Sequence, residues 1–380
     1  MNNAFIFPGQ GSQKVGMGQD IFKAFSSARE VFEEVDESLS ENLSKIIFEG
    51  PQEKLNLTEF AQPALMTISM ALLKVLEKEM GFNLKKNISM LAGHSLGEYS
   101  ALASAGTFSL KDVSRLLKVR GKSMQFATPL GTGSMAAIIG STIEKVQVVL
   151  SSLPNDEVCE IANNNSPGQI VISGHKTAID QLIKISAQFE ISKIIKLPVS
   201  APFHCSLMSP AADKIKEYMD NINLIRPSVN LVSNISAREE NKPDIIKDLL
   251  IKQVTGTVKW LESVNYMIEN GIERFIEIGE GRVLSGLVKR INKNVEILNI
   301  SNPKQLEEFS KIYRWNMFKL LEKRVLVTGA TGGIGNAIVK ALHDAGAKIA
   351  VSGTNKKKLN ELVERFGPEI KIVEFDLYDL

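Results

Sequence analysis

The alternation of apolar and polar positions predicts α/β architecture for the first part of the chain. Apolar runs and helical periodicity predict a strand, two helices, a strand and a helix over Ala4–Phe7, Ile21–Leu39, Ala64–Met80, Ile88–Ala92 and Leu96–Ala105. The second strand and the last helix flank Ser95, and a sharp turn between a strand and a helix is typical of α/β folds. We therefore expect a parallel sheet in the core.

From Met135 the pattern changes to that of a smaller unit. Its predicted order is strand, helix, strand, strand, helix and strand, over Met135–Ile139, Ile143–Leu153, Val158–Ala162, Gln169–Ser173, Thr177–Phe189 and Ile194–Val199. This order is typical of a ferredoxin-like subdomain. We expect residues 131–199 to be inserted into a core made of residues 1–130 and 200–312. The core resumes with two helices and a strand, over Ala211–Asn221, Lys247–Met267 and Arg274–Ile278.

A third unit is predicted after a linker over residues 313–320. It alternates strands and helices, over Arg324–Thr328, Asn336–Ala345, Lys348–Ser352, Lys356–Phe366 and Ile370–Phe375. This alternation predicts a partial Rossmann-type βαβαβ unit over residues 321–380.

The composition is that of an ordinary globular chain, with 380 residues of which 44% are hydrophobic and 23% charged, enough for more than one domain. The longest uncharged stretch, Ser123–Ile143, is broken by Pro129 and by glycines, so we expect no membrane span. Ala4–Phe7 has no basic leader and is too short for a secretory signal, which favours a cytoplasmic location. Cys159 and Cys205 are too few for a disulfide framework or a zinc site.

The charges of the chain nearly cancel, with 45 basic and 43 acidic residues. The basic excess lies in residues 317–380, which hold 10 basic and 8 acidic residues. Proteins that bind nucleic acids or anionic membranes typically carry a strong positive net charge, which this chain lacks. We expect neither partner.

Gly93-His94-Ser95-Leu96-Gly97 has the Gly-x-Ser-x-Gly spacing of a nucleophile elbow. In this turn, typical of hydrolase-like parallel-sheet folds, the serine hydroxyl is exposed at the carboxyl end of the sheet. The helix N-terminus and the backbone N–H of Leu96 would stabilise a developing oxyanion. We expect Ser95 to be a catalytic nucleophile, with a chance match in an ordinary turn as the alternative.

A serine nucleophile needs a base, and the chain has four histidines. His94 points away from the serine in a regular elbow, His175 stands at a turn that favours a capping role, and His343 lies in the tail. His204 follows the inserted unit, in a segment outside regular structure. Elimination favours His204, although spacing alone does not establish contact with Ser95.

Arg120 falls on an apolar helix face together with Val113, Leu116, Leu117 and Met124. A buried guanidinium without a partner carries a large free-energy penalty. Two interpretations are open. Arg120 forms an internal salt bridge, or it lines a pocket and binds the carboxylate of an acyl substrate through two parallel hydrogen bonds.

Six motifs resemble those of the malonyl-CoA:acyl-carrier-protein transacylases of fatty-acid synthesis, over residues 1 to about 312. They are Phe7-Pro8-Gly9-Gln10-Gly11-Ser12-Gln13, Gly93-His94-Ser95-Leu96-Gly97-Glu98-Tyr99-Ser100, Val119-Arg120-Gly121, Asn165-Ser166-Pro167-Gly168-Gln169, Pro202-Phe203-His204 and Gln253. Glu280 departs from the proline usual in this family, at a turn without a catalytic role.

The resemblance implies that Ser95 is acylated by malonyl-CoA, that His204 is the base and that Arg120 binds the malonyl carboxylate. The malonyl group would then pass to the phosphopantetheine thiol of acyl carrier protein. Malonyl-CoA and acyl carrier protein are therefore the implied partners, with no cofactor for the transfer. We expect a monomeric core.

The resemblance also implies an oxyanion hole formed by the backbone N–H groups of Gln10 and Leu96. The main-chain carbonyl of Gln253 would orient the histidine. Phe203 resembles a bulky residue that would crowd a 2-methyl branch on the substrate. Further pocket residues are expected at Met124 and Asn165.

The tail contains Thr328-Gly329-Ala330-Thr331-Gly332-Gly333-Ile334-Gly335, which resembles the dinucleotide-binding turn of 3-oxoacyl-acyl-carrier-protein reductases, members of the short-chain dehydrogenase/reductase family. Gly329, Gly333 and Gly335 would let the backbone approach a pyrophosphate. No acidic residue ends the second strand and Lys356–Lys358 follow it, which favours NADP over NAD. None of the five tyrosines has a lysine four residues on, so we expect weak NADP binding without reductase activity.

Two other functions stay open at this point. A serine esterase or thioesterase would use the same nucleophile with water as the acceptor. A nucleotide-binding regulatory module is the other alternative, and only the sequence of the tail favours it. Release of CoA in a burst, without steady hydrolysis, would separate a transacylase from a hydrolase.

Overall fold

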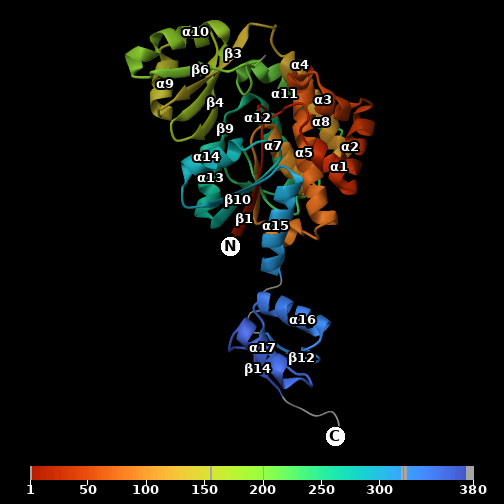
Figure 1. The fold of residues 1–380 in the computed structure, drawn as a ribbon. Coiled ribbons are helices and arrows are strands. Elements are labelled where there is room, and N and C mark those ends of the chain that lie inside the picture. The colour runs from red at the N-terminus through yellow and green to blue at the C-terminus, as the bar shows by residue number, and fades with distance from the viewer. Residues whose placement is uncertain (1, 155, 200, 318–319, 321–322, 374–380) are drawn as a thin grey trace. The chain divides into compact units, whose positions relative to one another are not determined.

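The structure is a computed structural model that describes residues 2–154, 156–199, 201–317, 320 and 323–373. The chain divides into two units, Met1–Leu306 and Glu307–Leu380. Sheets of six and five strands belong to the first unit, and a three-stranded sheet belongs to the second. Helices accompany all three sheets, so the fold is mixed α/β (Figure 1).

The six-stranded sheet positions the turns that carry the candidate site. Its strand order is β11 (Glu296–Ile300), β10 (Ile272–Ile278), β1 (Asn2–Phe7), β2 (Met90–Gly93), β7 (Leu231–Val232) and β8 (Glu239–Glu240), parallel except for the last pair. Phe7 of β1 lies in register with Gly93 of β2. The turns that follow these two parallel strands therefore lie side by side at the carboxyl edge of the sheet.

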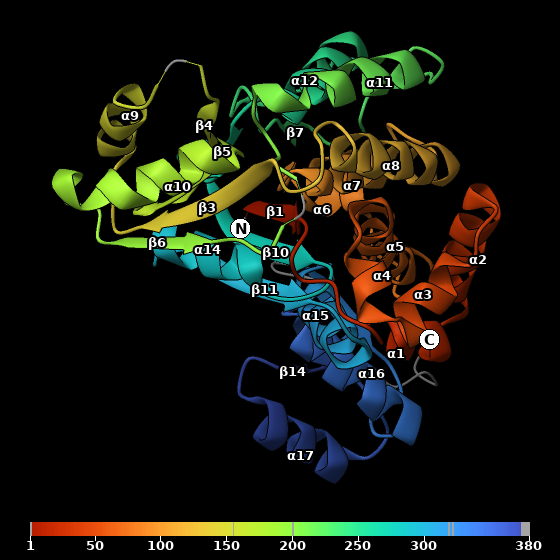
Figure 2. The ribbon, with the colours of Figure 1, turned by 90° about the horizontal axis from the view of Figure 1, so that it is seen from above.

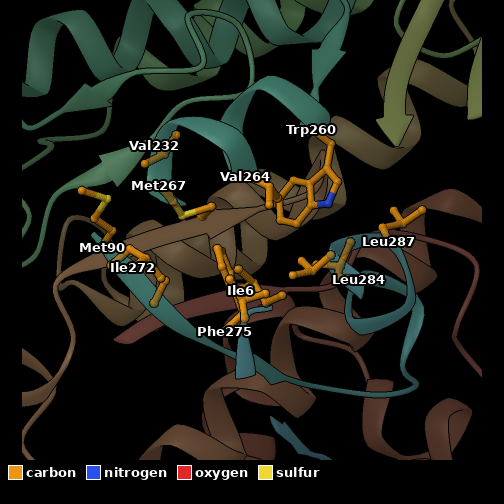
Figure 3. Packing of buried hydrophobic residues seen from close by; sticks show 14 of the residues in the cluster. Ile6, Met90, Val232, Trp260, Val264, Met267, Ile272, Phe275, Leu284 and Leu287 are labelled. Atoms are coloured by element: carbon orange, nitrogen blue, oxygen red, sulfur yellow. The ribbon is translucent and has the colours of Figure 1, made fainter. Parts of the chain in front are cut away.

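Helices cover both faces of this sheet, which explains why β1 is apolar at successive positions. On one face, Ile6 and Phe275 pack against Trp260 of α13 (Trp260–Glu269) and Leu284 of α14 (Val283–Ile291), as Figure 3 shows. On the other face, α5 (Thr58–Lys78) contacts β10, and α7 (Leu96–Ser104) contacts β1 and β2. The sheet is thus buried between two helical layers.

Helix α5 is the central helix of the N-terminal half. By length and composition it is apolar enough to cross a membrane, yet 83% of the residues in its most apolar window are buried inside the fold. That burial is typical of a core helix. Helix α5 contacts α1 (Gln19–Ala24), α2 (Ser26–Leu39), α3 (Leu43–Glu49), α4 (Gln52–Asn56) and α8 (Leu110–Gln125). Helix α6 (Leu84–Asn87) follows it along the chain.

The five-stranded sheet is built mainly from residues 131–199. Its order is β6 (Lys193–Lys196), β3 (Gly133–Ile139), β5 (Gln169–His175), β4 (Cys159–Ser166) and β9 (Val258–Lys259). The first four strands pair antiparallel, whereas β9 pairs parallel with β4 and comes from outside this segment. Helices α9 (Ile143–Ser151) and α10 (Lys176–Ile185) pack on the sheet (Figure 2).

Several predicted boundaries were wrong because local breaks override apolar periodicity. The helix predicted over Ile21–Leu39 is divided at Phe25, which is extended. The helix predicted over Lys247–Met267 is two helices, α12 (Pro243–Thr255) and α13, because the chain is extended at Gly256 and then forms β9. The core also contains α11 (Ser209–Met219).

The predicted linker over residues 313–320 is largely helical. Helix α15 (Pro303–Met317) extends into it as far as Met317, and residues 318–319 lie outside the described part. Because the sequence after Lys304 keeps a helical period without proline or glycine, nothing local ends the helix earlier.

The second unit contains three parallel strands in the order β12 (Arg324–Val327), β13 (Lys348–Val351) and β14 (Lys371–Ile372). They alternate with α16 (Gly333–Asp344) and α17 (Lys356–Phe366). A small apolar core of Val327, Val339, Ile349 and Leu359 joins these elements. The strand predicted over Ile370–Phe375 extends beyond the described residues.

The close approach of α8 to α5 gives a testable prediction about Gly121. A Cβ at this position would lie 2.4 Å from the carbonyl oxygen of Thr58 and 2.7 Å from the Cα of Glu59, both backbone atoms. We expect Gly121→Ala to lower the free energy of unfolding by about 1–3 kcal/mol, because the helices must separate. Chemical denaturation measures this change.

Gly286 in α14 provides the matched control. A Cβ there meets no atom within 4 Å, so Gly286→Ala should stabilise the helix by about 0.5–1 kcal/mol. Equal effects of the two substitutions would contradict the close helix contact as the cause.

Candidate active site

Ser95 stands in the turn between β2 and α7 with a strained backbone, φ 53° and ψ −110°. The two glycines of the elbow are required by space. A Cβ on Gly97 would lie 2.1 Å from the carbonyl oxygen of Phe7, and one on Gly93 would lie 1.9 Å from the carbonyl carbon of Gly97. The Asn234 side chain clamps the turn, because its Oδ1 accepts from the Ser95 N–H at 2.9 Å and its Nδ2 donates to the Gly93 carbonyl at 2.7 Å.

His204 lies directly beside the serine. Its Nε2 is 2.7 Å from Ser95 Oγ, and its Nδ1 is 2.8 Å from the main-chain carbonyl of Gln253. A carbonyl only accepts, so Nδ1 carries the proton and Nε2 is free to accept from the serine hydroxyl. The Gln253 carbonyl thus occupies the place that an aspartate has in a Ser-His-Asp triad.

The imidazole of His204 is buried and uncharged. Burial, and after it the positive charge of Arg120, lowers the pKa of His204 to about 3. The ring is therefore neutral over the physiological pH range, which is the state that a general base requires.

Arg120 of α8 is 1% exposed and reaches the nucleophile. Its Nη1 donates to Gln62 Oε1 at 2.8 Å, and its Nη2 donates to Gln253 Oε1 at 2.9 Å and to Ser95 Oγ at 3.1 Å. None of the ion pairs among the described residues involves Arg120, so the internal salt bridge considered above is not found there. The guanidinium is a buried cation held by neutral groups.

Glu98 is a buried acid in the same network, in the first turn of α7. Its Oε2 accepts from Gln253 Nε2 at 2.6 Å, and its Oε1 accepts from the Asn234 N–H at 3.3 Å. Burial raises the pKa of Glu98 to about 7, against the opposing effects of Gln253, Ser233, Asn234 and Arg120.

Ser95, Arg120 and His204 open onto a cavity of about 860 Å³. Residues from distant parts of the chain line it together: Gln10, Gln62, Ser95, Leu96, Arg120, Met124, Phe203 and His204, and, from residues 131–199, Met135, Asn163 and Leu197. The backbone N–H groups of Gln10 and Leu96 have no acceptor among the described residues. They remain available to an oxyanion.

Asn165, expected in the pocket, does not line the cavity, and neither does Gln253. Gln253 is fully buried behind it and acts through its carbonyl and its side chain. The side chain of Asn165 faces His94, with Oδ1 2.8 Å from Nε2, and the neighbouring Asn163 lines the cavity instead. Asn163 and Asn165 are two residues apart in β4, whose pairing with β5 shifts register between Ile161 and Asn163 and again between Asn164 and Ser166.

The other histidines lie apart from the nucleophile's hydroxyl. His94 is held by Asn165 and by the ring of Trp260 at 5.7 Å, and burial lowers the pKa of His94. His175 precedes α10 without capping it, and its Nδ1 accepts from the Val158 N–H at 2.9 Å. His343 lies in α16, 5.2 Å from the ring of Phe366.

Sequence reasoning missed Gln62, Glu98 and Asn234. The sequence does contain a signal for Gln62 and Glu98, because each is a polar residue within a helix whose other positions are mostly small or apolar. Asn234 follows a two-residue strand and carries no such signal. Within the described ranges, no group of three or more His, Cys, Asp or Glu side chains is placed to hold a metal ion.

Comparison with known proteins identifies the family of the chain. Residues 4–301 match the model of the acyl transferase domain. The chain belongs to the acyl transferase family. Residues 323–380 match the short chain dehydrogenase model, in agreement with the resemblance seen in the tail.

The relatives of this acyl transferase are named for one reaction. The malonyl CoA-acyl carrier protein transacylase of Bacillus subtilis is 43% identical over 305 residues, which cover 80% of this chain and 95% of the relative. The acyl-carrier-protein S-malonyltransferase of Bartonella henselae superposes with a TM-score of 0.80 at 47% identity, over 82% of this chain and 99% of that one. A malonyl-transacylase solved in complex with a type II polyketide-synthase acyl-carrier protein superposes with a TM-score of 0.79 at 36% identity, over 82% of this chain and all of that one.

The burial of His204 predicts its titration. We expect the imidazole to stay neutral down to about pH 5, because its folded-state pKa lies far below the usual value near 6.5. Arg120→Ala should raise the pKa of His204, since it removes the positive charge that, after burial, lowers this pKa most. NMR of the chain labelled with ¹⁵N-histidine measures both, with His204→Ala for assignment. A wild-type midpoint near pH 6.5 would contradict the buried, neutral base.

Proposed function

We propose that the chain transfers the malonyl group of malonyl-CoA to the phosphopantetheine thiol of acyl carrier protein, through a malonyl ester of Ser95. The observation that carries the proposal is the buried guanidinium of Arg120, 3.1 Å from a serine hydroxyl that is paired with a neutral imidazole. The names of the relatives support the same transfer, and we place it in fatty-acid synthesis by the resemblance seen in the sequence.

Arg120 selects the acyl group in this proposal. Its N–H groups are held by neutral oxygen atoms of Gln62 and Gln253, which a substrate carboxylate can replace or join. A charged hydrogen bond in a buried site is stronger than a neutral one, so a free carboxylate is preferred over a methyl group. Met124 and Phe203 also line the cavity.

The first half-reaction loads the serine. Ser95 Oγ attacks the thioester carbon as its proton passes to His204 Nε2. The N–H groups of Gln10 and Leu96 bind the oxyanion that forms. The C–S bond then breaks, and CoA leaves as a thiol after taking the proton from Nε2.

The second half-reaction reverses these roles. The carrier thiol gives its proton to His204 Nε2 while its sulfur attacks the ester carbon. The C–O bond to Ser95 breaks, and the serine oxygen recovers the proton. A thioester forms and an ester is lost, so the enzyme returns to its starting state.

The finer description of the fold belongs to the same proposal. A parallel sheet with the nucleophile after β2 supports a hydrolase-like core, with residues 1–130 and 200–312 as one domain. The order β6-β3-β5-β4 supports a ferredoxin-like subdomain inserted over residues 131–199. The location expected for this metabolism is the cytoplasm, and we expect the core to act as a monomer.

Intact-mass spectrometry after mixing the full chain with malonyl-CoA tests the function. We expect one malonyl adduct per chain, lost on addition of acyl carrier protein and absent from Ser95→Ala. Ser151→Ala, an exposed serine in α9, should load as the wild type does. Arg120→Ala should shift preference from malonyl-CoA toward acetyl-CoA.

Two outcomes would contradict this account. Steady release of malonate without carrier protein would favour a thioesterase over a transacylase. An Arg120→Ala variant with unchanged preference would remove the guanidinium from substrate selection.

For the tail we propose a partial Rossmann-type unit with weak NADP binding and no reductase activity. The parallel order β12-β13-β14 supports it, as does the glycine-rich turn before α16. Gly335 allows the helix to approach this turn, because a Cβ there would lie 2.2 Å from the Gly329 carbonyl oxygen.

Titration of the full chain with NADPH and with NADH tests the tail. We expect weak binding that favours NADPH and weakens when Lys356, Lys357 and Lys358 are all replaced by alanine. Oxidation of NADPH in the presence of a 3-oxoacyl thioester would contradict the absence of reductase activity.

A further inference from the structure

The buried carboxyl group of Glu98 takes no part in the transfer steps above, yet it belongs to the network that holds Arg120. Glu98 is 0% exposed and lies three residues after the nucleophile. A carboxylate in such a place is costly unless donors and an opposite charge compensate it. The groups that it contacts therefore indicate what it does.

Gln253 connects the carboxyl group to the guanidinium. Its Nε2 donates to Glu98 Oε2 at 2.6 Å, and its Oε1 accepts from Arg120 Nη2 at 2.9 Å. A carboxylate only accepts and a guanidinium only donates, so a single orientation of the amide satisfies both. Nε2 also donates to the Ser95 carbonyl at 2.9 Å, which agrees with the same orientation.

This bridged arrangement and a direct salt bridge differ in whether a substrate carboxylate can reach the N–H groups of Arg120. An acid in contact with Arg120 would occupy the N–H groups that a substrate carboxylate needs. An acid on the far side of an amide offsets part of the buried positive charge and leaves those groups accessible. Burial lowers the pKa of Arg120, and Glu98 is among the groups that oppose this effect.

We propose that Glu98 is a positioning residue for acyl-group selection, which orients the Gln253 amide and so holds the Arg120 guanidinium where the substrate carboxylate binds. The inference rests on the proposed function, since it assumes that the acyl group carries a free carboxylate. Glu98 itself touches neither the acyl group nor the reacting atoms.

The test must separate positioning from simple support of the fold. Glu98 also accepts from the Asn234 N–H, and Asn234 in turn clamps the Ser95 turn. Loss of that support would slow the acylation of Ser95 by every thioester to the same degree. Displacement of the Arg120 guanidinium would slow acylation by malonyl-CoA far more than acylation by acetyl-CoA.

The experiment compares kcat/KM for malonyl-CoA and acetyl-CoA in the full-length wild type and in Glu98→Gln. The assay is run at about pH 8, above the pKa of about 7, so that Glu98 is ionised in the wild type. The new amide presents its own N–H donors to Gln253 or to Asn234, which breaks one of the two pairings. We expect the malonyl-to-acetyl ratio to fall about tenfold or more.

Glu277 provides a matched control. It is also 0% exposed, and it accepts from the N–H groups of Leu284 and Ser285 and from the Ser285 hydroxyl, all in α14. Glu277→Gln removes a buried charge of the same type outside the Arg120 network. It should lower stability and leave the malonyl-to-acetyl ratio unchanged.

Glu98→Asp keeps the charge but shortens the side chain by one methylene, and its ratio should lie between those of wild type and Glu98→Gln. Where Glu98→Gln does not fold, a ratio for Glu98→Asp below that of the wild type supports the proposal. An equal loss of kcat/KM with malonyl-CoA and with acetyl-CoA, or an unchanged ratio in the folded variants, overturns it. A wild type that does not accept malonyl-CoA overturns the proposed function instead.

Discussion

A buried cation beside a neutral serine–histidine pair is the constraint on which the site depends. Arg120 donates to Ser95 Oγ, and the same oxygen is paired with His204 Nε2, so charge, nucleophile and base are joined through one atom. Burial, and after it the positive charge of Arg120, lowers the pKa of His204 and keeps the imidazole uncharged. Since no acid pairs with Arg120 directly among the described residues, an anionic substrate is the natural partner.

The fold supplies this arrangement by bringing distant segments to one edge of a sheet. Adjacent parallel strands place the turn of Gln10 beside the elbow of Ser95, and α8 approaches α5 closely enough for Arg120 to reach Gln62. Met135 and Asn163, from strands β3 and β4 of the five-stranded sheet, also line the cavity. Gln253 of α12 then holds base, cation and nucleophile together through its main chain and its amide.

Residues in recognisable local patterns were predictable, and residues fixed by tertiary contacts were not. The Gly-x-Ser-x-Gly spacing and elimination among the histidines singled out Ser95 and His204, and the helical period placed Arg120 on a buried face. Asn234 was missed because it acts from an irregular turn, 139 residues away from the serine that it clamps. The short strand β9 was missed because its pairing with β4 depends on a distant partner and not on its own two residues.

A crystal structure of the full chain after reaction with malonyl-CoA would test the central claim most directly. The account predicts a malonyl ester on Ser95 whose free carboxylate lies within about 3 Å of the Nη atoms of Arg120. An ester whose carboxylate points to solvent, with Arg120 donating to Gln62 and Gln253 and not to the carboxylate, would contradict it.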